Sequence, residues 1–173
     1  MKSVLAALVS ALILGACASA APEGPRATAI MKPTAGNTAG GTVTFVQKGK
    51  LLVMQADISG LRPNTEHGIH IHEKGDCSAA DGSSAGGHFN PTNKPHGHYA
   101  TAESHAGDMP NLKSDANGAA KLSVPLQAVN TQDGASNNII GRSVIIHAAP
   151  DDYHSQPSGN SGARIACGVI QKG

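Results

Sequence analysis

The sequence of 173 residues predicts an all-β domain, built as an antiparallel sandwich or barrel. Two observations favour this class. Beyond the first residues, no stretch repeats its apolar side chains at the spacing of an amphipathic helix. Short segments instead alternate apolar with polar residues, and turns rich in glycine separate them. Because aromatic residues make up only 2% of the chain, Val, Ile, Leu and Ala are expected to fill the core.

The predicted strands follow from this alternation and from turn signals. A Lys-Gly-Lys turn at 48–50 joins the first two segments into a hairpin, and an Asp-Ala-Asn-Gly turn at 115–118 precedes a later strand. Two segments, 73–110 and 150–163, are too long and too rich in glycine, proline and polar residues to be strands, so we expect functional loops there. The expected strands are 42–47, 51–58, 68–72, 120–126, 143–147 and 164–170.

The first residues predict an export signal that is separate from the fold. Lys2 precedes an apolar run at 4–16, which is too short to span a bilayer and fits a secretory signal. The run ends in Leu-Gly-Ala before Cys17, which resembles the bacterial lipobox, while an ordinary signal cut near Ala18 or Ala20 is the alternative. The expected division is a lipoprotein signal at 1–16, a flexible tether at 17–26 with a lipid on Cys17, and one domain at 27–173.

The export signal also predicts a location. Ala18 after the acylated cysteine resembles a sorting signal for the outer membrane, so we expect a lipid-anchored protein of the bacterial cell envelope, on the periplasmic side. That compartment is oxidising, and the two cysteines that remain, Cys77 and Cys167, are expected to pair there. Without Lys2, the 13 basic residues become 12 and balance 12 acidic ones, so no nucleic-acid partner is expected.

One strand carries a pair of histidines. His70 and His72 are two residues apart in an alternating segment, so both imidazoles project from the same face of the strand. Ile69 and Ile71 then point into the core. Two imidazoles on a rigid strand are suited to one metal ion, although an exposed polar face would show the same alternation. His67 has the parity of the two isoleucines, and we expect it to be a hydrogen-bonded structural residue.

The 73–110 loop supplies a second candidate set. His88, His96, His105 and Asp108 make a plausible tetrahedral zinc site, and a metal ion could order a loop that has no core of its own. His98 competes with His96, because both lie in one Pro-His-Gly-His-Tyr run, and the spacing alone does not choose between them.

Two further residues allow a structural or a functional interpretation. His147 ends an apolar strand, from which an imidazole reaches a neighbouring loop, although a lone histidine there is more often structural. Asp151 follows Pro150 and is either a solvated turn residue or the acceptor for the second nitrogen of a metal-binding histidine. If the imidazoles outside the zinc set converge, their all-imidazole ligation suits Cu(II).

Six strings of residues stand out in chain order: Gly-Ile-His-Ile-His-Glu at 68–73, Gly-Asp-Cys at 75–77, Ala-Gly-Gly-His-Phe-Asn-Pro at 85–91, His-Ala-Gly-Asp at 105–108, Ile-Gly-Arg-Ser-Val-Ile-Ile-His at 140–147 and Ala-Arg-Ile-Ala-Cys-Gly-Val at 163–169. Together they closely resemble the copper–zinc superoxide dismutases in their bacterial periplasmic form, and the resemblance runs from about residue 27 to the C-terminus. It implies an eight-stranded Greek-key barrel with two long functional loops. It also implies an enzyme that converts superoxide to O₂ and H₂O₂ by alternating reduction and reoxidation of a bound copper, beside a structural zinc; relatives occur as monomers and as homodimers.

The resemblance assigns a role to each candidate residue. It implies a disulfide between Cys77 and Cys167, close to an Arg164 that attracts the anionic substrate. It selects His96 over His98, and it places Asp151 between His70 and His96. His88 is implied to bridge both metals, to let go of reduced copper and to take up a proton. The implied copper ligands are His70, His72, His88 and His147, and the implied zinc ligands are His88, His96, His105 and Asp108.

A binding protein is the rival interpretation. A periplasmic copper or zinc buffer could be built on the same fold, and relatives that serve as chaperone domains can lose copper ligands. Here all four copper positions are histidine and Arg164 is present, which favours the enzyme.

Overall fold

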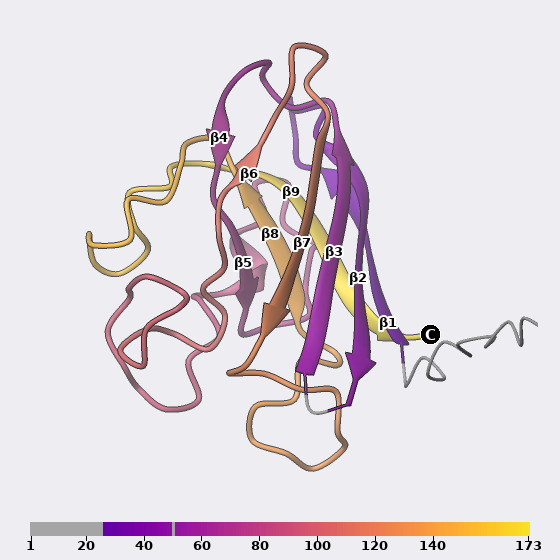
Figure 1. Ribbon diagram of the computed structural model, residues 1–173. Coiled ribbons are helices and arrows are strands. Elements are labelled where there is room, and N and C mark those ends of the chain that lie inside the picture. The colour runs from indigo at the N-terminus through magenta and orange to yellow at the C-terminus, as the bar shows by residue number, and fades with distance from the viewer. Residues whose placement is uncertain (1–25, 50) are drawn as a thin grey trace, which may run out of the picture.

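The protein is a curled antiparallel sheet with long loops on one side, seen in a computed structural model that describes residues 26–49 and 51–173 (Figure 1). Apart from one short 3-10 turn, the regular elements within 26–49 and 51–173 are strands, which confirms the all-β prediction. The expected signal, the lipid on Cys17 and the tether up to residue 25 lie outside the described residues. Among the residues described, no helix has the length and apolar character needed to cross a membrane. The elements are β1 (Arg26–Pro33), β2 (Gly40–Lys48), β3 (Leu51–Ser59), β4 (Glu66–His67), β5 (Ile69–His72), η1 (Ser83–Ala85), β6 (Leu112–Lys113), β7 (Ala120–Leu126), β8 (Ser143–His147) and β9 (Arg164–Lys172).

The strands follow a Greek-key order. Seven of the described strands form one sheet in the order β5-β8-β9-β1-β2-β3-β7, and β4 pairs with β6 in a second, two-stranded sheet. Only Gly68 separates β4 from β5, so counting them as one strand gives the eight strands that the resemblance implies. After β7, the chain crosses over so that β8 lies between β5 and β9, which is a Greek-key connection. This crossover brings the end of β8 beside the histidine pair of β5.

The core lies inside the curl of the sheet. Alternate residues of β2 and β3 point inward, and Val43, Phe45, Met54 and Ile58 are at most 1% exposed. Burial of each such side chain stabilises the fold by about 1.5–3 kcal/mol. Strand β1 was not among the predicted strands. Its inward residues are mostly alanines, and these small side chains made the alternation of Arg26–Pro33 hard to recognise in the sequence.

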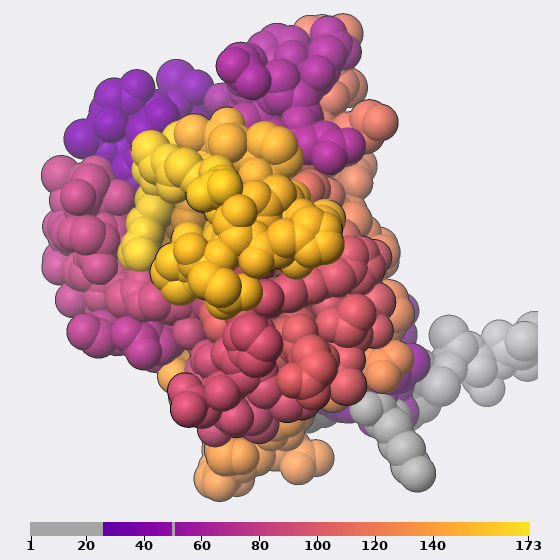
Figure 2. Space-filling view, turned by 90° about the vertical axis from the view of Figure 1, so that its left-hand side faces the viewer, coloured from indigo at the N-terminus to yellow at the C-terminus, as the bar shows by residue number. Residues whose placement is uncertain are grey.

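The two predicted loops cover the outer face of β5 and β8. They lie against each other on the surface (Figure 2). Parts of the 73–110 loop run along β5: Phe89 N donates to Ile71 O at 2.8 Å, and Ile71 N donates to Gly107 O at 2.9 Å. A third irregular segment, 127–142, joins β7 to β8 and was not predicted as a long loop. Because loops cover its outer face, β5 is buried on both sides, and His70 and His72 are at most 1% exposed.

Candidate metal centre

Two clusters of potential metal ligands lie side by side beneath the loops, and they share His88. In each cluster, the potential ligand atoms all lie within 4.8 Å of one another. Every residue of both clusters is buried. The first cluster is His70, His72, His88 and His147, and the second is His88, His96, His105 and Asp108.

Strands position the first cluster. β5 holds His70 and His72 on one face, as their parity predicted, and β8 pairs antiparallel with β5. His147 lies at the end of β8, where the register shifts opposite Arg164 of β9. His88 approaches from the 73–110 loop and forms an isolated bridge with His72. Residues far apart in the sequence therefore bring four imidazoles to one point.

The inner nitrogens of this cluster fit a metal ion. His70 Nδ1, His72 Nε2, His88 Nε2 and His147 Nε2 are buried, and none has a hydrogen-bond partner. Leaving a buried polar atom without a partner costs about 1–3 kcal/mol, so four such atoms that converge would be unfavourable without a shared ligand. An ion bound to their lone pairs would remove that cost.

The outer nitrogens are held by the protein. His72 Nδ1 donates to the carbonyl of Gly86 at 2.9 Å, and His147 Nδ1 donates to the carbonyl of Gly162 at 3.2 Å. His70 Nε2 lies 2.8 Å from Asp151 Oδ2. A ring nitrogen that donates in this way leaves the lone pair on the opposite nitrogen, which is the one that faces the centre of the cluster.

The second cluster is gathered around one carboxylate. Asp108 Oδ1 lies 2.9 Å from His88 Nδ1, 3.1 Å from His96 Nδ1 and 3.4 Å from His105 Nδ1. Ligands at typical zinc–nitrogen distances around a tetrahedral ion are separated by about 3.3 Å, so this spacing fits zinc. Asp108 Oδ2 accepts hydrogen bonds from the main-chain nitrogens of His105 and Gly97 at 2.9 and 3.2 Å. His88 turns Nδ1 to this cluster and Nε2 to the other.

Burial keeps the shared and strand-borne imidazoles neutral. It is the main cause that lowers the pKa of His88 to about 4 and the pKa of His147 to about 3, and it holds the pKa of His72 well below its usual value. Neighbouring imidazoles lower these pKa values further. Neutral imidazoles are the form that binds metal ions.

In the second cluster, hydrogen bonds with carboxylates oppose the effect of burial on the pKa of a histidine. Burial acts to lower the pKa of His96, but its hydrogen bonds with Asp108 and Asp151 outweigh burial and raise that pKa to about 9. Burial likewise acts to raise the pKa of Asp108, while hydrogen bonds with His105 and the other imidazoles hold it far below its usual range. A metal ion that binds here must therefore displace a proton from His96.

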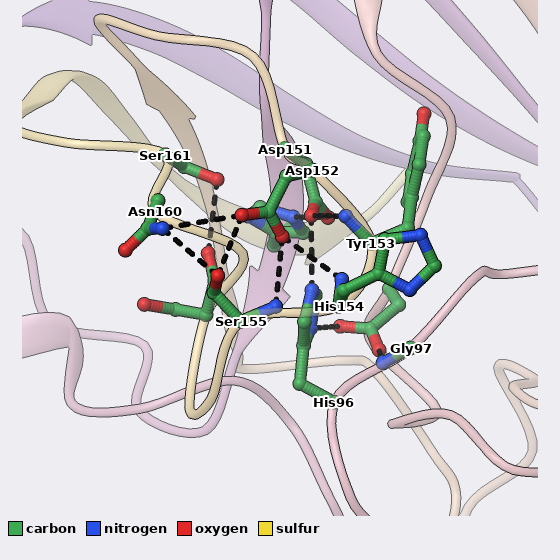
Figure 3. A network of polar contacts seen from close by, with 12 residues as sticks. His96, Gly97, Asp151, Asp152, Tyr153, His154, Ser155, Asn160 and Ser161 are labelled. Carbon is green, nitrogen blue, oxygen red and sulfur yellow. Dashed lines mark hydrogen bonds and ion pairs between the residues drawn. The ribbon is translucent and has the colours of Figure 1, made fainter.

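Asp151 connects the clusters. Its Oδ2 faces His70, and its Oδ1 lies 2.9 Å from His96 Nε2 (Figure 3). The side-chain amide of Asn111 holds the main chain of Asp151: it accepts from Asp151 N at 2.9 Å and donates to Asp151 O at 3.0 Å. The next residue, Asp152, accepts hydrogen bonds from Ser155 and Asn160 and so folds the loop locally (Figure 3).

Arg164 begins β9 beside the first cluster. Its guanidinium donates to the carbonyls of Gly82 at 2.8 Å and Gly86 at 2.6 Å, so the 73–110 loop fixes its direction. The predicted disulfide is confirmed: Cys77 and Cys167 are joined, with an S–S distance of 1.97 Å, and tie the same loop to β9. Arg164 is close enough to the cluster that its charge contributes to lowering the pKa of both His72 and His147.

The remaining histidines lie outside both clusters. His98 is exposed and its ring packs on Tyr99 and Tyr153, with ring centroids 4.5 and 4.8 Å away. His154 is also exposed. His67 is buried, donates from Nδ1 to the carbonyl of His147 at 2.8 Å and has Thr65 Oγ1 2.8 Å from Nε2, which confirms it as a hydrogen-bonded structural residue.

The groups that hold the ligands in place were not predicted from the sequence. These are the amides of Asn111 and Gln156, the main-chain carbonyls of Gly86 and Gly162, and Gly159, whose backbone packs against Asp151 and His96. Every residue has a main-chain carbonyl, so the residue type does not indicate which carbonyl accepts a hydrogen bond. An amide side chain in a polar loop cannot be told from a solvated one in the sequence. Only the glycine content of the 150–163 loop hinted at close packing.

Comparison with known proteins agrees with this geometry. The family described as copper/zinc superoxide dismutase matches residues 39–170. A Cu-Zn superoxide dismutase of Aquifex aeolicus is 41% identical over 134 residues, which are 76% of this chain and 79% of that protein. One of Caulobacter vibrioides is 40% identical over 151 residues, 84% and 85% of the two chains. The crystal structure of a double mutant of a SOD-like protein from Bacillus subtilis matches with a TM-score of 0.75 and 38% identity, over 83% of this chain and 96% of that one. The family matches residues 39–170, which is most of the chain, and both clusters are present. The chain therefore belongs to the copper/zinc superoxide dismutase family.

Proposed function

We propose that the chain is a superoxide dismutase, with copper bound by the first cluster and zinc by the second. The observation that carries this proposal is the set of four buried ring nitrogens that face one point without a hydrogen-bond partner. The family match supports the same conclusion, because its curated relatives include Cu-Zn superoxide dismutases. Copper would supply a one-electron redox couple there, and zinc would supply a fixed positive charge.

The protein supplies proton handling through His88. Its Nδ1 faces Asp108, while Nε2 faces the first cluster and is buried without a partner. Because burial lowers the pKa of His88 to about 4, a proton placed on Nε2 is readily given up to a more basic acceptor, such as a reduced oxygen species. Neighbouring imidazoles lower that pKa further, which favours release.

Arg164 supplies the attraction for the substrate. Superoxide is a small anion without a distinctive shape, and a guanidinium provides charge that does not titrate in the physiological range. The carbonyls of Gly82 and Gly86 accept from this guanidinium and hold it at the edge of the first cluster. A metal buffer would have no use for a positive charge held in this place, so Arg164 favours the enzyme over the binding protein.

The function can be tested with the chain from Gly24 onward, loaded with copper and zinc. We expect fast loss of superoxide that depends on copper, that disappears in His147→Ala, and that falls roughly 10–100-fold in Arg164→Ala while both metals stay bound. His98→Ala is the matched control, because His98 lies outside both clusters and should leave the rate unchanged. Tight binding of both metals without turnover would instead establish a metal buffer.

We also propose that the protein is attached to the periplasmic face of the bacterial outer membrane through a lipid on Cys17. The lipobox-like residues before Cys17 and the Ala after it support this proposal. Fatty-acid labelling and membrane fractionation should place the wild type in the outer membrane, and Cys17→Ser should abolish the label. The family resemblance allows both a monomer and a homodimer, and sedimentation of the soluble domain decides between them.

A further inference from the structure

Gln156 lies in the 150–163 loop and holds the main chain of His96 with both polar atoms of its side chain. Its Oε1 accepts a hydrogen bond from His96 N at 2.9 Å, and its Nε2 donates one to His96 O at 2.8 Å. One amide thus pairs with the main chain of one residue, as a neighbouring strand would. We propose that Gln156 is a positioning residue for His96, and through it for the zinc ion of the second cluster.

The position of His96 explains why such support is needed. His70, His72 and His147 lie on strands, whose ladders fix the backbone of each ligand. His96 lies in an irregular segment between Pro95 and Gly97, where none of the described strands pairs with it. Small shifts of a ligand backbone displace its imidazole from a metal ion, so supporting residues commonly affect metal affinity. The amide of Gln156 does for His96 what the strand ladder does for the other three.

Different residues of the 150–163 loop contact the ring and the main chain of His96. Asp151 Oδ1 lies 2.9 Å from the Nε2 atom of the His96 ring. Gly159 lies so close to this pair that a Cβ atom there would be 1.8 Å from Asp151 Oδ1 and 2.8 Å from His96 Nε2. Both contacts concern the ring, and Gln156 is the contact from this loop that reaches the main chain. Gln156 is itself exposed, so it can be replaced without opening the core.

The inference rests on the proposed zinc site, and its test is zinc binding measured separately from catalysis. Gln156→Met keeps the length of the side chain and removes both hydrogen bonds to His96, together with the longer one from Nε2 to His154 O at 3.3 Å. Competition against a chromophoric chelator should show zinc affinity reduced roughly 10–100-fold, with copper affinity equal to that of the wild type. Gln156→Glu keeps an oxygen that accepts from His96 N, so its zinc affinity should lie between those of the wild type and Gln156→Met. Gln132→Met, at an exposed glutamine of the 127–142 loop, is the control and should bind zinc normally.

Two further readouts separate positioning from a general loss of structure. The melting temperature of the metal-free Gln156→Met variant should match that of the wild type, and the His96 amide should exchange its hydrogen faster in the zinc-loaded variant. Equal loss of zinc and copper affinity, or unchanged zinc affinity in Gln156→Met, would overturn the role of Gln156. If the wild type itself binds no zinc, the zinc assignment fails and this inference fails with it.

Discussion

The two clusters are built on different kinds of support. In the first, three of four imidazoles project from β5 and β8, which pair with each other in the seven-stranded sheet. In the second, His96, His105 and Asp108 all come from the irregular 73–110 loop. A strand ladder fixes a ligand before any metal arrives, whereas a loop must be held by its own hydrogen bonds or by the metal. We therefore expect copper binding to tolerate changes in the loops better than zinc binding does.

The strongest test of this difference is Asp108→Ala. The Asp108 carboxylate is the common partner of three imidazoles and accepts two main-chain hydrogen bonds, so its loss removes both a ligand and the centre of the loop. We expect zinc affinity to fall by more than about 100-fold and residues 94–110 to exchange amide hydrogens faster. The strand residues of β5 and β8 should remain protected. Equal exchange in strands and loop would contradict the division between the two clusters.

Opening the disulfide tests how the loop is tied to the sheet. Cys77 and Cys167 are separated by 90 residues, and closing a loop of that length stabilises a protein by about 4–5 kcal/mol in the chain-entropy model. We expect the paired Cys77→Ser and Cys167→Ser variant to lose a large part of that free energy of unfolding, measured by urea denaturation. Because the loop carbonyls also hold Arg164, the rate of dismutation should fall as well.

Gly159→Ala tests the contact between the 150–163 loop and His96. The backbone there has a φ of +66°, and the added Cβ would collide with Asp151 and His96. Gly134→Ala is a matched control, because Gly134 has a φ of +81° but nothing within 4 Å of its Cβ position. Both variants carry the backbone strain, and only Gly159→Ala should lose zinc affinity, by roughly 10-fold. An equal effect of the two would reduce the role of Gly159 to strain alone.

In the metal-free protein, the two clusters should affect the free energy of unfolding at opposite ends of the pH range. The folded pKa values of His88 and His147, about 4 and about 3, lie below the usual 6.5, so the unfolded chain binds more protons and stability falls as the pH drops below 6.5. The folded pKa of His96 is about 9, so its stabilising contribution is complete below 6.5 and is lost as the pH rises through 9. Each pKa unit corresponds to roughly 1.4 kcal/mol.

Denaturation of the metal-free protein across this range measures both effects. His147→Gln should flatten the acid side, because it removes one histidine that the fold keeps neutral. It should leave the alkaline side as it is in the wild type, since His96 and its carboxylate partners are untouched. If His147→Gln changed stability equally on the acid and the alkaline side, the two clusters would not titrate independently.

Much of the metal centre could be predicted from the sequence, because the direction of a side chain on a strand depends on its immediate neighbours in the chain. The parity of His70 and His72 followed from a two-residue spacing on a strand, and the buried, hydrogen-bonded state of His67 followed from the opposite parity. Strand β1 was not predicted, because its alanines give little contrast between inward and outward positions. The sequence also left His96 and His98 equivalent, because neighbours in a loop have no fixed direction until something packs against them.

The all-β class, the two functional loops and the set of residues that could bind metals were predictable from the sequence, because alternation and residue type act over short distances. The folded arrangement was needed to show that His88 faces both clusters, that Asp151 reaches His70 and His96, and that the amide of Gln156 pairs with the main chain of His96. Those contacts join segments that are distant in the chain. They depend on where a crossover places β8 and on which carbonyls the loops present, and neither is encoded in the identity of a single residue.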